Sequence, residues 1–338
     1  MPKASKKVIL KTTMSCPAQA QEYYEIETHK DLIELLQEKK WQSHDLMVLG
    51  YGSNTIFKKA LQNVVLSNRV LGKKIVNEDS DFVYICFGAG ENWHDCVEWT
   101  LQQGFYGLEN LALIPGLVGA APIQNIGAYG AELADIFDSL LCVDIASAKT
   151  QSFSLKDCQF SYRDSVFKGE WLGQKVITSV TLKLSKQAKS YNFSSLYPSL
   201  QSEFLADDII MPLDVFHAVC RVRSKKLPNP DELPNSGSFF KNPVVNSKEY
   251  LVLRDSYSDI VAYETPVGFK LAAGWLIEKA GLKGFSQTNG IGCYKNQALV
   301  IVNPQHRSGE EVLSFAEFVK SSVYEKFAVH LEVEPRVY

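Results

Sequence analysis

The segment from residue 114 to residue 130 contains four glycines and two prolines and has no charged side chain. Glycine and proline at this density interrupt helices and strands, so the sequence predicts a long irregular loop. Long loops inside compact domains are usually functional or disordered. Because disordered segments are normally polar or charged, we expect this apolar loop to be buried against the rest of the fold.

Outside this loop, the spacing of hydrophobic residues is helical in some segments and strand-like in others, and the two kinds of segment do not alternate regularly. The predicted helices cover residues 28–40, 92–103, 270–280 and 308–326. The predicted strands cover residues 23–27, 46–49, 82–87 and 329–333, with further short strands between residues 139 and 188, while residues 221–248 are predicted to be loops around a cleft. This pattern indicates an α+β fold with several small sheets, in a chain of 338 residues that is long enough for two or three domains.

Two of the predicted helices have recognisable first residues. Thr28 can cap the helix at residues 28–40, and its three leucines at positions 32, 35 and 36 form one apolar stripe. Ser308 and Glu311 have the spacing of a capping box at the start of the helix at residues 308–326. We expect both helices to pack against a core through one face.

The composition argues against several functions. The formal net charge is −3 and no cluster of Lys and Arg marks a nucleic-acid-binding face. No apolar stretch is long enough to span a membrane. The seven cysteines and six histidines lack CxxC and HxxxH spacings, so no metal site is expected. Scattered cysteines in odd number indicate reduced thiols and a cytoplasmic protein.

The sequence GYGSN at residues 50–54 follows a predicted strand and contains two glycines. Backbone N–H groups in such a turn can bind anionic oxygens, although a turn of this kind is more often only structural. No GxxxxGK[ST] phosphate loop is present, and no GxGxxG fingerprint follows an early strand. Together with the loop at residues 114–130, whose polar side chains include Gln124, Asn125 and Tyr129, the turn favours a site for a large cofactor.

Two further segments contain residues suited to proton transfer and charge stabilisation. Arg163 beside Tyr162 could stabilise negative charge on an enolate, although a surface ion pair with Asp164 is the commoner arrangement. Ser238 lies between Gly237 and two aromatic residues, which predicts a tight, shielded turn from which a hydroxyl could deliver a proton. A serine that only shapes the turn is the commoner case, and the absence of a GxSxG motif leaves a hydrolase triad poorly supported.

Charged residues elsewhere leave two possibilities open. Lys226 could hold a diphosphate or polarise a carboxylate, or it could be a solvated lysine. In the predicted C-terminal strand, Glu332, Glu334 and Arg336 alternate and therefore share one face. That face could be an exposed edge or could close a site.

Taken in order, these segments resemble the UDP-N-acetylenolpyruvoylglucosamine reductases, the MurB family of peptidoglycan synthesis. The similarity extends from about residue 45 to residue 336. It is carried by the blocks LGYGSNTIF, GAGENWHDCVEWTLQQG, GLENLALIPGLVGAAPIQNIGAYGAEL, YRDSVFK, SKKLPNP, GSFFKNPV, KLAAGWLIEKAGLKG, NQALVIVN and LEVEPR. So many blocks in the family's order make a chance match implausible.

The resemblance implies FAD as the cofactor, NADPH as the co-substrate and a UDP-sugar as the substrate. NADPH would reduce FAD, and the enolpyruvyl ether of UDP-N-acetylglucosamine would then be reduced to UDP-N-acetylmuramate. The implied FAD-binding residues are Gly50, Gly52, Ser53, Asn54, Pro115, Gly116, Gly119, Gln124, Asn125, Gly127 and Tyr162. The implied catalytic residues are Ser238, as the proton donor, and Arg163 and Glu334, which would stabilise the enol or enolate. The implied substrate-binding residues are Tyr129, Tyr191, Lys226, Asn242 and Gln297.

The resemblance also implies an architecture. An FAD-binding fold of the vanillyl-alcohol-oxidase (PCMH) type would form two subdomains, at residues 1–71 and 72–215. A smaller α+β substrate-binding domain would follow at residues 216–338. The protein is expected to be a cytoplasmic monomer that binds no nucleic acid and does not insert into a membrane.

Three positions depart from the family pattern. Phe193 occupies the place of a tyrosine that reaches the substrate diphosphate, and Tyr191 on the same face could substitute for it. Pro335 follows Glu334 and removes an N–H group beside it. The segment at residues 12–14 reads Thr-Thr-Met where the family has Asn-Thr-Phe.

Two other functions compete with this reading. One is a flavin-dependent oxidase of the same broad fold, which would use O2 and another substrate. The other is a module that binds a UDP-sugar or flavin without catalysis. Rapid reoxidation of the reduced flavin by air would favour the oxidase, and a bound flavin that NADPH cannot reduce would favour the module.

Overall fold

The computed structural model describes residues 4–38, 41, 46–58 and 61–338, and the chain forms two compact units. Unit 1 comprises Met1–Val8, Ala20–Tyr51 and Gln62–Arg223, and unit 2 comprises Ile9–Gln19, Gly52–Leu61 and Ser224–Tyr338. Each unit is therefore assembled from three stretches of chain. The finer division at residues 71 and 215 remains a prediction.

Unit 1 contains a four-stranded sheet in the order β1-β2-β5-β3, which shares a core with helix α1. These elements are β1 (Ser5–Ile9), β2 (Gln19–Ile26), α1 (His29–Glu38), β3 (Leu46–Leu49) and β5 (Leu61–Asn68). Thr28 Oγ1 donates to the Asp31 carboxylate at 2.7 Å and accepts from the Asp31 N–H at 3.1 Å, which caps the helix. The predicted leucine stripe is buried and thus confirmed, while residues 39–40 of the predicted helix lie outside the described residues.

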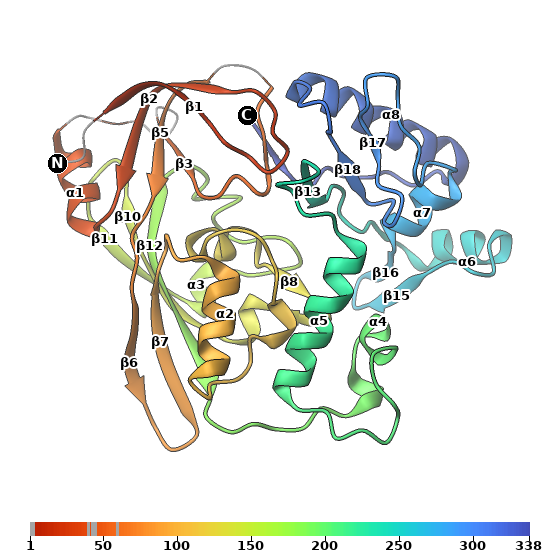
Figure 1. Ribbon diagram of the computed structural model, residues 1–338, viewed down its shortest axis with the longest axis horizontal. Coiled ribbons are helices and arrows are strands. Elements are labelled where there is room, and N and C mark those ends of the chain that lie inside the picture. The colour runs from red at the N-terminus through yellow and green to blue at the C-terminus, as the bar shows by residue number, and fades with distance from the viewer. Residues whose placement is uncertain (1–3, 39–40, 42–45, 59–60) are drawn as a thin grey trace. The chain divides into compact units, whose positions relative to one another are not determined.

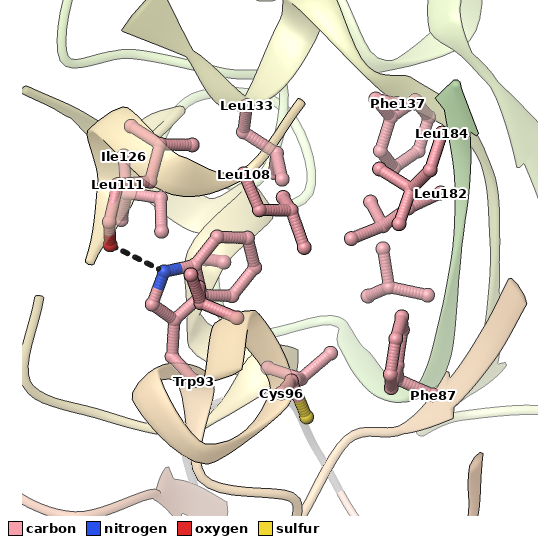
Figure 2. Close-up of a cluster of buried hydrophobic side chains, with 14 of the residues drawn as sticks. Phe87, Trp93, Cys96, Leu108, Leu111, Ile126, Leu133, Phe137, Leu182 and Leu184 are labelled. Carbon is pink, nitrogen blue, oxygen red and sulfur yellow. Dashed lines mark hydrogen bonds between the residues drawn. The ribbon is translucent and has the colours of Figure 1, made fainter. Parts of the chain in front are cut away.

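The larger sheet of unit 1 is antiparallel, in the order β11-β10-β12-β7-β6. Its strands are β6 (Lys73–Glu78), β7 (Phe82–Gly88), β10 (Phe137–Asp144), β11 (Thr150–Ser154) and β12 (Lys175–Ser185). Helix α2 (Trp93–Gln102) packs on this sheet through the core that Figure 2 shows. Within that core the buried Trp93 donates its Nε1–H to the Leu111 carbonyl at 2.9 Å.

The loop at residues 114–130 is buried, as predicted, but it is not irregular throughout. Val118–Gln124 form a 3₁₀ helix, whose Val118 and Ala121 belong to the same core as α2. The prediction of an irregular loop is wrong for this part. Short 3₁₀ helices need only backbone hydrogen bonds between residues three positions apart, so they can form within a segment of this composition. One such bond runs from the Ala120 N–H to the Leu117 carbonyl at 3.0 Å.

Short elements and one long helix complete unit 1. The short elements are 3₁₀ turns at Glu109–Leu111, Leu133–Asp135 and Phe193–Ser195, strands β8 (Gly127–Ala128) and β9 (Ala131–Glu132), and helices α3 (Leu155–Cys158) and α4 (Pro198–Gln201). Helix α5 covers Pro212–Lys226 and buries Val215, Val219 and Val222 at helical spacing. The prediction of loops from residue 221 onward is therefore wrong for the end of this helix.

Unit 2 is built on small sheets, in the orders β13-β18-β17, β14-β16-β15 and β19-β4. The strands are β4 (Thr55–Ile56), β13 (Asn235–Ser238), β14 (Val244–Val245), β15 (Ala262–Thr265), β16 (Gly268–Leu271), β17 (Gly292–Cys293), β18 (Val300–Val302) and β19 (Arg336–Val337). The helices are α6 (Ser247–Ser256), α7 (Ala273–Lys279) and α8 (Gly309–Phe327). Helices α7 and α8 share one core with β17 and β18, and α8 has the predicted Ser308–Glu311 capping box. Figure 1 labels these four elements in the blue, C-terminal part of the chain.

Two predictions for the C-terminal part of the chain are wrong. The predicted helix at residues 270–280 begins only at Ala273, because Gly268–Leu271 pairs with β14 and β15 as strand β16. The predicted strand at residues 329–333 is not formed. Instead Val333 makes an isolated bridge to Phe240, and β19 pairs with β4.

In the described ranges of the chain, no helix is both long and apolar enough to cross a bilayer.

Candidate functional site

The turn after β3 contains the first group of predicted cofactor residues. Gly50 lies beside the apolar loop, since a Cβ built on Gly50 would be 3.6 Å from Leu117 Cδ1. Gly52 has a φ of +70°, and a Cβ built on it would lie 2.8 Å from the Lys11 carbonyl oxygen. Only glycine fits this position, because both the backbone angle and the close approach exclude a side chain.

Backbone hydrogen bonds fix the segment Gly52–Asn54 within unit 2. Thr13 donates its N–H to the Gly52 carbonyl and its hydroxyl to the Ser53 carbonyl, each at 3.2 Å. The Arg336 N–H donates to the Asn54 carbonyl at 2.9 Å. These bonds preorganise a turn whose remaining backbone groups could bind an anionic ligand.

The apolar loop of unit 1 rests directly on the end of β7. The Gly119 N–H donates to the Ala89 carbonyl at 2.9 Å, and the Gly116 carbonyl accepts from the Trp93 N–H at 3.0 Å. A Cβ built on Gly119 would lie 2.6 Å from the Ala89 Cβ, which is too close for any side chain. Gly119 therefore allows the loop and the sheet to approach each other.

Asn125 shapes the loop with its side chain. It has a φ of +44° and is buried. Its Nδ2 donates to the Glu132 carboxylate at 2.7 Å and to the Ser161 carbonyl at 3.2 Å, while its Oδ1 accepts from the Ala134 N–H at 3.0 Å. Since these bonds use the amide, the predicted contact of Asn125 with a cofactor would come from its backbone.

Arg163 lies against the last part of the same loop. It has a φ of +55°, its Nη2 donates to the Gly127 carbonyl at 2.7 Å, and its carbonyl accepts from Lys168 Nζ at 2.9 Å. Its guanidinium lies 5.4 Å from the centroid of the Tyr162 ring, within cation–π range. The structure thus brings Arg163, Tyr162 and Gly127 together in unit 1.

Tyr129 contacts a residue that the sequence analysis missed. Its side chain hydrogen-bonds to Arg223 on α5, and burial raises the pKa of the Tyr129 hydroxyl. Burial also lowers the pKa of Arg223, and the nearby Arg163 lowers it further. Arg223 Nε is buried and has no hydrogen-bond partner among the described residues. Two neighbouring guanidinium groups could bind a carboxylate or a phosphate, and no sequence motif around Arg223 indicated such a contact.

Tyr191 donates its hydroxyl inside unit 1. The acceptors are Glu109 Oε1 at 2.5 Å and Asn110 Oδ1 at 3.3 Å, and Asn110 Nδ2 in turn donates to the Tyr129 carbonyl at 2.9 Å. Burial, followed by the Glu109 carboxylate, raises the pKa of Tyr191. Phe193 packs against the core of unit 1.

Ser238 and Glu334 lie on adjacent backbone segments of unit 2. Ser238 pairs with Val300 across β13 and β18, and the Glu334 N–H donates to the Phe239 carbonyl at 2.9 Å. Phe239 is fully buried but Ser238 is exposed. The predicted shielded turn is therefore wrong for this serine, whose hydroxyl is open to a ligand.

Asn242 and Gln297 both contact the first turn of α7. Asn242 Oδ1 accepts from the Ala273 N–H at 2.9 Å, and a Cβ built on Gly274 would lie 2.9 Å from Gln297 Oε1. Lys226, the last residue of α5, is exposed to solvent. Partial desolvation nevertheless lowers the pKa of its ammonium group.

The predicted site residues are divided between the two units. The group in unit 1 is Gly50, Pro115, Gly116, Gly119, Gln124, Asn125, Gly127, Tyr129, Tyr162, Arg163 and Tyr191, and the group in unit 2 is Gly52, Ser53, Asn54, Lys226, Ser238, Asn242, Gln297 and Glu334. The surroundings of Gly52 fit a cofactor with polar groups, because the buried Thr12 hydroxyl beside it has no hydrogen-bond partner in the described part of the chain and a cofactor could supply one. Among the same described residues, no cluster of His, Cys, Asp or Glu could hold a metal ion.

Two family descriptions match the sequence. UDP-N-acetylenolpyruvoylglucosamine reductase, C-terminal domain, matches residues 229–338, and FAD binding domain matches residues 20–154. Relatives named UDP-N-acetylenolpyruvoylglucosamine reductase include a Shewanella sp. (strain ANA-3) protein, 46% identical over 96% of this chain and 92% of its own length. Others are from Burkholderia ambifaria (46% identical, covering 86% of this chain and 83% of its own) and Aliivibrio fischeri (42% identical, covering 91% and 86%).

Solved structures share the fold. A UDP-N-acetylenolpyruvylglucosamine reductase from Thermus caldophilus aligns over 100% of both chains with a TM-score of 0.67 at 23% identity. A solvent-stable cholesterol oxidase aligns over 98% of this chain and 87% of its own with a TM-score of 0.51 at 10% identity. At these identities the likeness concerns the fold alone. With the FAD binding domain match, it confirms the predicted α+β fold of the vanillyl-alcohol-oxidase (PCMH) type.

Proposed function

We propose, because this chain belongs to the UDP-N-acetylenolpyruvoylglucosamine reductase family, that it reduces UDP-N-acetylglucosamine enolpyruvate to UDP-N-acetylmuramate. The chain is a flavoprotein oxidoreductase of peptidoglycan precursor synthesis, with FAD as its cofactor and NADPH as its co-substrate. Bound FAD supplies the hydride chemistry that links NADPH to the enol ether. The residues of the chain bind, orient and protonate the reactants.

The bond between the Glu334 N–H and the Phe239 carbonyl is the observation that best supports the catalytic assignment. It keeps Glu334 beside the strand that carries Ser238, so both side chains belong to one rigid part of unit 2. We assign to Ser238 the proton that reaches the substrate carbon next to the carboxylate. Because Ser238 is exposed, the bound reactants themselves would have to shield this proton transfer from water.

The neighbouring guanidinium groups of Arg163 and Arg223 support an anion site in unit 1. The substrate has a carboxylate and a diphosphate, and arginine binds both groups well. We assign to Arg163 the stabilisation of the negative charge that develops on the carboxylate side of the substrate. Arg223 is proposed as a second cation of this site, and Tyr129 as a substrate contact.

The remaining assignments concern binding. Asn242, Gln297 and Lys226 are proposed to contact the substrate, while the turn at residues 50–54 and the loop from Pro115 to Gly127, with Tyr162, are proposed to hold FAD. The proposed contact of Tyr191 with the substrate would require its hydroxyl to leave Glu109.

We also propose that the protein works as a monomer in the cytoplasm, without nucleic acid as a partner. All seven cysteines are free thiols, which supports a reducing compartment. The formal net charge of −3 offers no general attraction to nucleic acid.

The reaction of the reduced enzyme distinguishes this function from that of an oxidase. The protein is reduced with one equivalent of NADPH under nitrogen and then mixed with the enolpyruvyl substrate or with air-saturated buffer. We expect rapid recovery of the oxidised flavin spectrum with the enol ether and slow recovery with oxygen. Rapid recovery with oxygen and none with the enol ether would contradict the proposal in favour of an oxidase.

A further inference from the structure

The N-terminal segment Leu10–Cys16 is built into the core of unit 2. Met14 is fully buried there, and its carbonyl accepts from Asn303 Nδ2 at 3.0 Å. The segment includes the Thr-Thr-Met sequence that departs from the family pattern. It is therefore a fixed part of unit 2.

Thr13 connects two turns that contain predicted site residues. Its N–H and hydroxyl both donate to carbonyls of the Gly52–Asn54 turn, at 3.2 Å. Its own carbonyl accepts from the Asn235 N–H at 2.9 Å, and Asn235 Oδ1 accepts from the Gly237 N–H at 2.9 Å. Because Ser238 is the next residue, a continuous set of hydrogen bonds joins the predicted cofactor turn to the predicted proton donor.

Thr12 lies directly against the same turn. A Cβ built on Gly52 would be 3.1 Å from Thr12 Cγ2, so the two residues are in contact. Thr12 is only 8% exposed, and its hydroxyl is buried without a hydrogen-bond partner in the described part of the chain. Burying a hydroxyl without a partner is unfavourable, so such a group is expected to gain one, which a water, an ion or a ligand can supply.

We propose that the segment Leu10–Cys16 is part of the FAD site. Thr13 is a positioning residue for the Gly52–Asn54 turn, and the Thr12 hydroxyl contacts the bound cofactor. This inference rests on the proposed function, in which that turn binds FAD. A role of Thr12 in packing alone makes the opposite prediction, because a packing residue affects folding and not cofactor affinity.

Isosteric variants separate the two roles. Thr12→Val and Thr13→Val remove one hydroxyl each, and Thr12→Ser restores the hydroxyl at position 12. Thr265→Val is the matched control, because Thr265 Oγ1 also donates to a turn carbonyl of unit 2, that of Gly268, at 2.9 Å. For each full-length protein, the Kd for FAD is measured by fluorescence titration of the apoprotein, together with the unfolding temperature of the apoprotein.

We expect Thr12→Val to weaken FAD binding about tenfold, as the loss of one buried hydrogen bond predicts. Its apoprotein should unfold at the wild-type temperature or higher, because an unsatisfied hydroxyl has been removed. Thr12→Ser should recover most of the affinity. Thr13→Val should weaken FAD binding and lower the unfolding temperature, whereas Thr265→Val should lower only the unfolding temperature.

Two outcomes would overturn the inference in distinguishable ways. If wild-type protein binds FAD and Thr12→Val binds it equally well, the inference fails and the proposed function stands. If the wild-type apoprotein binds no FAD at all, the proposed function fails and the inference fails with it.

Discussion

Replacing Tyr191 with phenylalanine removes one hydroxyl from a buried network in unit 1. That hydroxyl donates to Glu109 Oε1 at 2.5 Å, and the other carboxylate oxygen accepts from the Gly107 N–H at 2.7 Å. Glu109 is only 2% exposed, so water cannot easily replace the lost donor. A hydrogen bond to a charged group contributes about 1.5–3 kcal/mol. Because Glu109 keeps its bond to Gly107, we expect Tyr191→Phe to lower the free energy of unfolding by about 2 kcal/mol.

Urea-induced unfolding followed by tryptophan fluorescence tests this value. Tyr23→Phe is the matched control, because Tyr23 makes a 3.5 Å contact to Glu25 at an exposed position. We expect the control to change stability by less than about 0.5 kcal/mol. A double-mutant cycle of Tyr191→Phe with Glu109→Gln then isolates the coupling between the two side chains.

The resemblance to the reductase family gives a competing prediction for the same variant. If the Tyr191 hydroxyl served the substrate and not Glu109, Tyr191→Phe would raise KM several-fold. Wild-type stability combined with such a rise in KM would refute the structural reasoning. A loss of stability with little change in KM would support it.

Three further predictions concern Tyr191, Gly119 and Ser238. Burial raises the pKa of Tyr191, so at alkaline pH the folded state keeps a proton that the unfolded state loses. The free energy of unfolding should therefore fall above about pH 10. Unfolding measured across alkaline pH should show a smaller fall for Tyr191→Phe. Gly119→Ala should cost about 1–3 kcal/mol in thermal unfolding, because its Cβ would lie 2.6 Å from that of Ala89. The control Gly169→Ala should cost much less, because a Cβ built there would meet only the Val166 carbonyl oxygen, at an ordinary contact distance of 4.0 Å. Ser238→Ala should leave flavin reduction by NADPH intact and slow reoxidation by the enol ether at least about a hundredfold in stopped-flow; equal slowing of both half-reactions would contradict the role of Ser238.

Elements with a local signal were predictable from the sequence. Helix α8 follows from the Ser308–Glu311 capping box and a stripe of buried apolar residues, and α1 follows from Thr28 and its leucines. In both cases the helix is specified by residues within a few positions of each other. The burial of the loop at residues 114–130 was predictable for a similar reason, namely its own composition.

Features that depend on distant contacts were not predictable. Residues 270 and 271 were predicted to begin a helix, yet pairing with β14 and β15 makes them part of strand β16, because tertiary pairing overrides local propensity. Arg223 joins the candidate site only because α5 carries it to Tyr129. Likewise, the exposure of Ser238 depends on how β13 pairs with β18, and the two aromatic residues after it give no information about that.

The dependence of NADPH oxidation on the enolpyruvyl substrate is the direct test of the proposed reductase activity. Purified protein with bound FAD is mixed with NADPH under nitrogen, with and without UDP-N-acetylglucosamine enolpyruvate, and the product is identified by mass spectrometry. We expect sustained NADPH oxidation only with the enol ether, with formation of one UDP-N-acetylmuramate for each NADPH consumed. Reduction of the flavin that stops after one turnover in the presence of the enol ether would contradict it.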